Sequence, residues 1–168
     1  FRWMQEQSNA NVKPDCETYK LMILAFNYVK EAEKSEYYLE ELIKEIQSGS
    51  MKKVQFDHDH FDIVIGAWAK SNDPKAAERA TSVFERMEQL GIAPCVVSYN
   101  SLIWAWARSS NRNHVKIVDR IFQRMLKQWE EGKQFIKPND YTFHGVLFAL
   151  SRSKDPADLA AGSMLAKQ

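Results

Sequence analysis

Apolar side chains recur along the chain in four segments that share one spacing. In each segment an aromatic residue is followed by apolar residues three, four and seven positions later, and by an alanine six positions later. This spacing puts the apolar side chains on one face of an α-helix, and the small alanine lets a neighbouring helix approach closely. We therefore predict four equivalent helices, called A helices here, whose aromatic residues are Tyr19, Phe61, Tyr99 and Phe143.

A second apolar pattern follows the first three A helices, at residues 42–46, 83–87 and 121–125, and residues 1–4 match its end. We predict a second helix, called a B helix here, at each of these places. Asp73-Pro74 and Asp155-Pro156 stand where a B helix should begin, with a capping Asp before a Pro in the first turn. Each B helix is expected to stop near a glycine, which suits a helix C-terminus: Gly49, Gly91 and Gly132.

The two patterns together predict an all-α chain, a right-handed α-solenoid of helix-turn-helix hairpins. Stacked hairpins bury a continuous core and leave one concave face. The expected boundaries are 1–15 for the end of a preceding B helix, then 16–57, 58–95 and 96–139 for three repeats, and 140–168 for an incomplete fourth. The additional length of the first and third repeats is assigned to residues 47–55 and 127–137. Because the chain opens inside a helix, we expect it to be part of a longer protein.

Two stretches resemble one known family of helical repeats. Residues 96–103 read VVSYNSLI and residues 84–94 read FERMEQLGIAP, with a related closing segment, VKPD, at 12–15. They are similar to the opening and closing segments of a pentatricopeptide repeat. The resemblance covers nearly the whole chain and is most specific in the second and third repeats. Two departures are the long spacing between repeats and Phe56, which stands where the family usually has proline.

The resemblance implies binding of single-stranded RNA along the face formed by the A helices, with one base per repeat. In that family the base is recognised by the residue after the A-helix aromatic, together with the last residue of the repeat. An apolar residue two positions before the aromatic sandwiches the base. The third repeat fits, with Asn100, Asn139 and Val97 in these places, and an Asn pair resembles the family's pyrimidine readers, with cytosine favoured.

The other repeats depart from that scheme. The fourth has His144 after its aromatic and Tyr141 at the sandwich position, where it can stack on a base. The first and second repeats carry charged or otherwise atypical residues at the same three places, and carboxylates there would repel phosphate: Lys20, Asp57 and Glu17 in the first, and Asp62, Cys95 and Asp59 in the second.

Two further columns of the A helices are candidates for contacts with RNA. Nine residues after each aromatic stand Tyr28, Lys70, Arg108 and Arg152. The three cations form a stripe suited to phosphates, or they simply complement the helix dipole in the last turn and stay solvated. Five residues after each aromatic the column ends in Trp104 and Phe148, after Leu24 and Gly66. These two aromatics stack on bases, pack against a protein partner or fill the core between repeats, and the pattern alone leaves all three readings open.

Charge and composition add exclusions. With 23 basic and 22 acidic residues the net charge is +1, which does not by itself indicate a polyanion partner. The two cysteines, Cys16 and Cys95, are expected to be free thiols in a reducing compartment. Residues 57–62, DHDHFD, look like metal ligands, but His58 and His60 should face different ways and no cysteine is close in sequence, so we predict no metal and no cofactor. The chain has none of the common catalytic motifs and no apolar run long enough to span a membrane.

The leading hypothesis is therefore non-catalytic binding of single-stranded RNA, in maturation, stability or translation of organellar transcripts. A mitochondrial or plastid location is implied by the resemblance alone, and no targeting sequence in these residues indicates it. The alternative is a protein-binding scaffold, such as a helical-repeat subunit of an organellar ribosome, with ribosomal RNA or protein subunits as partners. The near-neutral charge, the atypical reader residues and the aromatic column favour this alternative.

Overall fold

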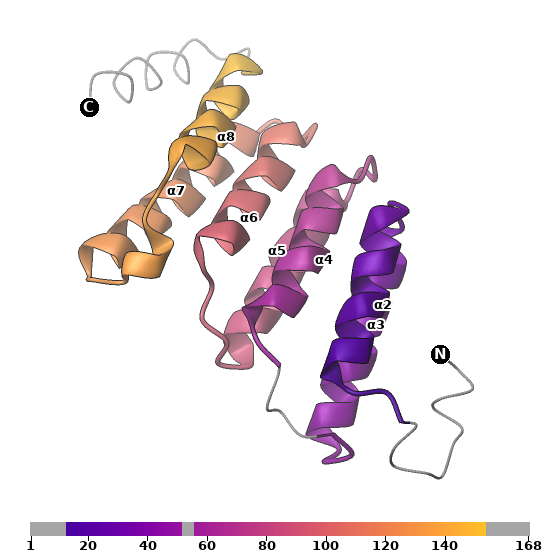
Figure 1. The fold of residues 1–168 in the computed structure, drawn as a ribbon. Coiled ribbons are helices and arrows are strands. Elements are labelled where there is room, and N and C mark those ends of the chain that lie inside the picture. The colour runs from indigo at the N-terminus through magenta and orange to yellow at the C-terminus, as the bar shows by residue number, and fades with distance from the viewer. Residues whose placement is uncertain (1–12, 52–55, 154–168) are drawn as a thin grey trace.

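The computed structural model describes residues 13–51 and 56–153, and every regular element in these two stretches is a helix. Consecutive helices pair as hairpins, α2 with α3, α4 with α5 and α6 with α7, and α8 follows the third hairpin (Figure 1). The prediction of an all-α chain of helical hairpins is confirmed. The elements are α2 (Cys16–Tyr28), α3 (Ala32–Gln47), α4 (His58–Lys70), α5 (Ala76–Gln89), α6 (Val96–Arg108), α7 (His114–Glu130), the short 3-10 helix η3 (Gln134–Ile136) and α8 (Asp140–Ser151).

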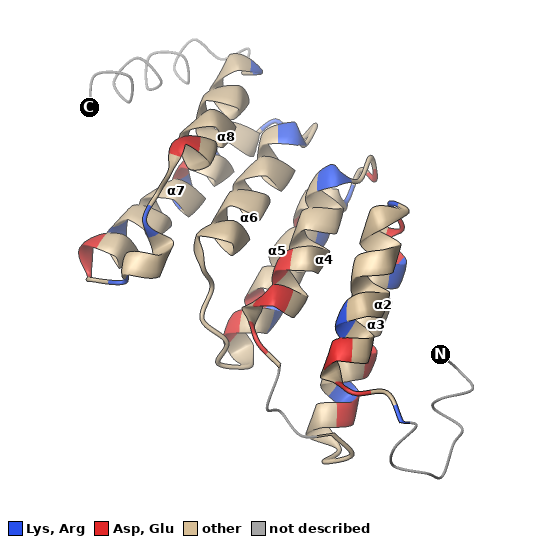
Figure 2. Ribbon diagram, in the orientation of Figure 1, with Lys and Arg blue, Asp and Glu red and all other residues tan. Residues whose placement is uncertain are grey.

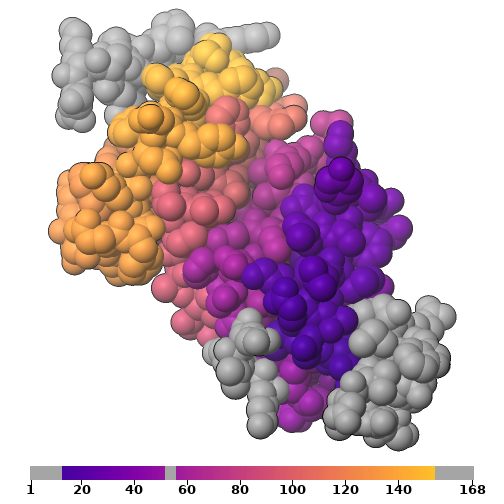
Figure 3. Space-filling view, viewed as in Figure 1, coloured from indigo at the N-terminus to yellow at the C-terminus, as the bar shows by residue number. Residues whose placement is uncertain are grey.

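The helices form two layers. The A helices α2, α4, α6 and α8 contact one another in chain order, and each B helix contacts its own A helix and the A helix that follows. The main contacts of each described hairpin are therefore with its neighbours, so the described residues form a linear stack. Their surface passes from the first to the last in sequence order (Figure 3). None of the described helices is both long and apolar enough to cross a lipid bilayer.

Each A helix begins with the same capping arrangement. The residue before the helix accepts a hydrogen bond from a backbone N–H of the first turn, and the third residue of the helix reaches back to the N–H of the cap. This reciprocal bonding satisfies N–H groups that have no partner inside the helix. The cap is also the residue that we expected to close the preceding repeat. The four pairs of cap and third residue are Asp15 with Thr18, Asp57 with His60, Cys95 with Ser98, and Asn139 with Thr142.

The predicted stops of the B helices are confirmed, because Gly49, Gly91 and Gly132 follow α3, α5 and α7 with φ of +76°, +72° and +97°. The predicted start of α5 is corrected. The helix begins at Ala76 after Lys75, and the carboxylate of Asp73 accepts from the Lys75 N–H at 2.7 Å. Asp73 therefore orders the turn that precedes the helix and does not cap it. Asp155-Pro156 and residues 1–4 lie outside the described residues.

The core consists of the apolar columns of the repeats. Tyr19, Phe61 and Tyr99 are at most 1% exposed, and the apolar residue four positions after each is fully buried. In α8, however, the equivalent Phe143 and Leu147 are 43% and 47% exposed. Tyr99 of α6 contacts two B helices, with its ring against Phe84 of α5 and its hydroxyl bonded to Gln128 of α7. Phe143 contacts Phe122 of α7, and α8 is the last described helix.

Candidate nucleic-acid interface

The predicted reader pair of the third repeat is brought together by two successive A helices. Asn100, in the first turns of α6, donates from Nδ2 to Oδ1 of Asn139, the cap of α8, over 3.2 Å. The Thr142 hydroxyl donates to Asn100 Oδ1 at 2.6 Å, and Asn100 is only 5% exposed. Val97, at the sandwich position, is 51% exposed. The pair is therefore assembled, but Asn100 already takes part in a network that joins two repeats.

The same network occurs one repeat earlier with different residues. Asp62 of α4 accepts from the Ser98 hydroxyl through Oδ1 at 2.5 Å and from the Cys95 thiol through Oδ2 at 3.2 Å. Burial raises the pKa of the Asp62 carboxyl, while the hydrogen bonds from Ser98 and Cys95 act in the opposite direction. Burial likewise raises the pKa of the Cys95 thiol. The atypical reader residues Asp62 and Cys95 of the second repeat, together with Ser98, thus form a hydrogen-bonded contact between α4 and α6, called a polar joint here.

The third residue of the A helix is the member that sequence reasoning missed. Ser98 and Thr142 are both fully buried and both donate to the residue that follows the previous aromatic. Their position three residues after a polar cap is the signature of a capping box. That signature is visible in the sequence, but the additional bond to the preceding helix is not.

A salt bridge connects the A helices of the first and second repeats, α2 and α4. Lys20 Nζ lies 2.7 Å from Oδ2 of Asp59, which occupies the sandwich position of the second repeat. This contact raises the pKa of the Lys20 ammonium and lowers that of the Asp59 carboxyl, each mainly through the shared hydrogen bond. Buried His60 accepts from the Asp57 N–H through Nδ1 and donates through Nε2 to the Cys16 carbonyl, at 3.5 and 3.4 Å. These side chains therefore pair with one another across the α2–α4 boundary.

The basic column lies at one end of the A-helix layer. Its three cations, Lys70, Arg108 and Arg152, are exposed, as is Tyr28 at the same position of α2. Figure 2 shows Lys or Arg at the upper ends of α4, α6 and α8, with acidic residues at the lower end of α4. Lys70 and Arg108 line one shallow cavity together with Trp104 and Tyr141. At about 70 Å³ this cavity is far below the roughly 300 Å³ of an enclosing ligand pocket, so it offers a surface contact.

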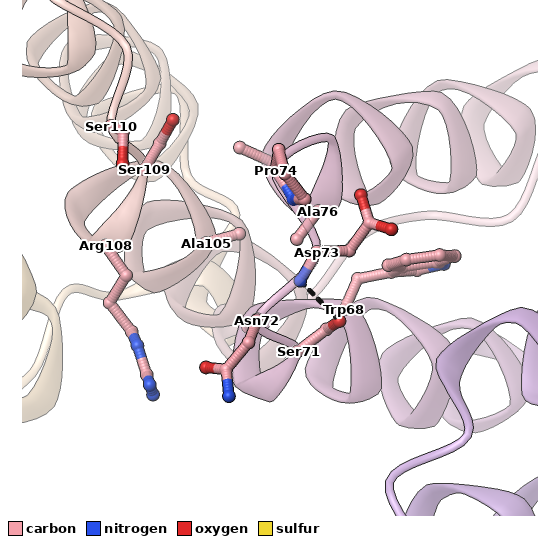
Figure 4. Close-up of a pocket in the computed structure, with 12 residues that line it drawn as sticks. Trp68, Ser71, Asn72, Asp73, Pro74, Ala76, Ala105, Arg108, Ser109 and Ser110 are labelled. Carbon is pink, nitrogen blue, oxygen red and sulfur yellow. Dashed lines mark hydrogen bonds between the residues drawn. The ribbon is translucent and has the colours of Figure 1, made fainter.

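Arg108 and Arg152 differ in what surrounds them. Arg108 borders a second hollow, between the loop after α4 and the end of α6, and its side chain extends on the same side as Asn72 (Figure 4). Arg152 donates from Nη1 to the Ala107 carbonyl at 2.7 Å, and its guanidinium lies over the Phe148 ring at 5.8 Å. One N–H group of the Arg152 guanidinium is therefore bonded to a carbonyl in the last turn of α6. Arg152 thus complements a helix dipole, which was one of the two interpretations of the basic stripe.

The aromatic column has two parts. Trp104 is partly buried against the core, and its ring lies 5.4 Å from that of Tyr141 and 5.3 Å from that of Phe148. Its indole nitrogen is buried near Gly145 and has no hydrogen-bond partner among the described residues. Tyr141 and Phe148 are 56% and 38% exposed, and His144 is also exposed. Core packing thus accounts for Trp104, while its two neighbours offer aromatic surface to a ligand.

The distance of the cysteines in sequence was a poor guide to the metal-binding side chains near residues 57–62. No cysteine is close to the 57–62 segment in sequence, but Cys95 Sγ lies 3.2 Å from Asp62 Oδ2 in the fold. His58 Nδ1 lies 3.3 Å from the same carboxylate oxygen. The turn of α4 that carries His58 and Asp62 therefore meets the cap of α6.

These features define a class of protein, an α-solenoid of helical hairpins that gathers polar joints, cations and aromatic rings on its A-helix layer. Residues 50–109 match the pentatricopeptide repeat domain. A pentatricopeptide repeat-containing protein of Arabidopsis thaliana, named as mitochondrial, is 30% identical over 102 residues, which cover 60% of this chain and 16% of that protein. The matched part is thus about a sixth of the length of that relative. Both matches support a pentatricopeptide repeat protein, and the family model covers residues 50–109 of this chain.

Proposed function

We propose that this chain binds single-stranded RNA without catalysing a reaction, as part of a protein that acts in maturation, stability or translation of transcripts in mitochondria or plastids. We assign the repeat units to residues 16–57, 58–95 and 96–139, with 140–168 as part of a fourth. The observation that carries the proposal is that Lys70 and Arg108 share one surface cavity with Trp104 and Tyr141. Phosphate contacts and aromatic stacking are the two interactions that hold single-stranded nucleic acid.

The reader pair supports the same proposal. Exposed Val97 lies one helical turn before Asn100, and Asn139 is exposed beside it. We expect a base placed on Val97 to be read first by the Asn139 amide nitrogen, because Asn139 Oδ1 already accepts from Asn100 and Thr142. It would reach Asn100 only after the bond between the two amides is exchanged for bonds to the base. Recognition of a base by this repeat therefore costs the free energy of the bond between Asn100 and Asn139. For this reason we expect only a modest preference for cytosine.

The test compares two charge reversals in an anisotropy titration with fluorescently labelled single-stranded RNA. Arg108→Glu should weaken binding and lower the slope of log affinity against log salt by about 0.7 for the lost phosphate contact. Arg120→Glu, at an exposed position of the B helix α7, makes the same change in net charge and should leave both quantities near those of the parent protein. Equal effects of the two variants would show that net charge alone matters and that the A-helix cavity is not the site.

A protein-binding scaffold, for example in an organellar ribosome, is the second candidate. The exposed rings of Tyr141 and Phe148 favour it, because exposed aromatics are enriched at protein interfaces. Tyr141→Ser is a cleaner probe than a change at Trp104, since Trp104 also fills the core. If Tyr141→Ser abolishes co-purification of a partner protein and leaves RNA affinity intact, the scaffold is the better description.

A further inference from the structure

Three metal-binding side chains of different types meet where α4 contacts the cap of α6. The Nδ1 atom of His58, a carboxylate oxygen of Asp62 and the Sγ atom of Cys95 all lie within 4.8 Å of one another. The Asp62 oxygen Oδ2 is central, at 3.3 Å from His58 Nδ1 and 3.2 Å from Cys95 Sγ. Nitrogen, oxygen and sulfur donors are therefore already gathered around one point.

The equivalent place one repeat later holds different chemistry. Asn100 and Asn139 occupy the positions of Asp62 and Cys95, and Val96 occupies the position of His58 at the start of the helix. Two amides and the Thr142 hydroxyl join the neighbouring A helices there. The joint between α4 and α6 instead has a carboxylate, a thiol and an imidazole, which a purely structural joint does not require.

The separations between the donors suit a tetrahedral ion. With the usual Zn²⁺ bond lengths, two ligand atoms of a tetrahedral site lie roughly 3.3–3.6 Å apart. The two measured separations at Asp62 Oδ2 are close to this range. Asp62 Oδ1 is occupied by the Ser98 hydroxyl and Cys95 Sγ accepts from the Val97 N–H, so both ligands are held in place by outer-sphere bonds.

One charged neighbour competes for His58. Its Nδ1 atom also lies 3.3 Å from Oδ1 of Asp59, whose other oxygen is paired with Lys20. The His58 side chain is 45% exposed, so it can turn toward Cys95 without disturbing the core. Such a rotation would bring His58 Nδ1 closer to Cys95 Sγ, from which it now lies within 4.8 Å.

We propose that His58, Asp62 and Cys95 form a Zn²⁺ site at the joint between α4 and α6, with its fourth position open to solvent. Borderline-soft Zn²⁺ accepts this mixture of sulfur, nitrogen and oxygen donors. On binding, a bond from Zn²⁺ to Cys95 Sγ replaces the S–H bond, and the thiol proton goes to solvent. The site goes beyond RNA binding and does not depend on it.

The test is a Co²⁺ titration of metal-free protein prepared without a histidine tag, followed by competition with Zn²⁺. We expect the visible bands of tetrahedral Co²⁺, a sulfur-to-cobalt charge-transfer band in the near ultraviolet, and loss of both when Zn²⁺ is added. Cys95→Ser retains an oxygen that can cap α6 and should abolish the charge-transfer band and weaken Zn²⁺ binding at least about a hundredfold, as expected for loss of a direct ligand.

Two further variants keep the test decisive. Asp62→Asn reproduces the residue found at the same position in the third repeat, so it should preserve the fold, as checked by circular dichroism, and weaken metal binding. Cys16→Ala removes the other thiol, which contacts Met51 at a distant place, and should leave the cobalt spectrum unchanged. A charge-transfer band that survives Cys95→Ser, disappears with Cys16→Ala, or never forms overturns the proposal.

Discussion

Gly145 offers a sharp test of how closely the A helices pack. A β-carbon built at Gly145 would lie 2.8 Å from Cγ2 of Ile103 and 3.3 Å from Nε1 of Trp104. Ile103 is fully buried and its Cγ2 atom is attached directly to the β-carbon, so this methyl group cannot swing away. The absence of a side chain at Gly145 is what lets α8 approach the indole of Trp104.

The magnitude follows from two opposing contributions. Replacing a helical glycine by alanine gains about 1 kcal/mol in helix propensity. Forcing an additional methyl group into a well-packed contact costs about 1–3 kcal/mol. Gly66 supplies the reference, because a β-carbon there would meet only Ser101 Oγ, at an ordinary 3.8 Å. Gly66→Ala should therefore stabilise the protein by up to about 1 kcal/mol, and Gly145→Ala should leave it about 1–3 kcal/mol less stable than Gly66→Ala.

The assay is urea denaturation followed by circular dichroism, with hydrogen exchange of the α6 and α8 amides as a local measurement. The local measurement is needed because a linear array can lose its last helix before the rest unfolds. Faster exchange in α8 for Gly145→Ala, with unchanged exchange in α4, is the expected pattern. If the two alanine variants are equally stable by both measurements, the close approach of α6 and α8 is not under steric control.

Two further predictions concern buried polar contacts. Thr142→Val removes the hydroxyl that donates to Asn100 at 2.6 Å, and should cost about 1–3 kcal/mol in urea denaturation because a buried carbonyl loses its partner; an unchanged midpoint would contradict this role. Glu36, which accepts from the Trp68 indole at 2.7 Å and pairs with Arg79, has its pKa raised by burial, with Arg79 and Trp68 opposing the shift. The folded pKa of Glu36 lies above the unfolded value of 4.5, so the ionised carboxylate is less favourable in the fold than in the unfolded chain. Glu36 therefore contributes to stability below pH 4.5, and this contribution is lost as the pH rises through the folded pKa. Glu36→Gln should therefore gain stability relative to the parent as the pH rises above 4.5, whereas a loss over the same change of pH would show that the ion pair outweighs burial.

The candidate site could be predicted only in part. The Asn100–Asn139 pairing follows from the repeat phase, since a residue early in one A helix and the cap of the next recur at fixed offsets. The exposed basic column follows for the same reason. The repeat phase does not show which of these side chains already have hydrogen-bond partners within the protein. Asn100 accepts from Thr142, and Arg152 donates to the Ala107 carbonyl. Which donors are free depends on side-chain rotamers at the contact between two helices.

The sequence by itself determined the hairpins, their phase and the ends of the B helices, because apolar periodicity and glycine stops act over one or two helical turns. Only the tertiary structure decided which residues of different repeats touch. It placed Cys95 beside Asp62, 33 positions away in sequence, and it set the large indole of Trp104 against the bare backbone of Gly145. The physical reason is that such contacts depend on the distance and rotation between neighbouring A helices. Those are fixed by the packing of all the side chains at the interface, and no local pattern encodes them.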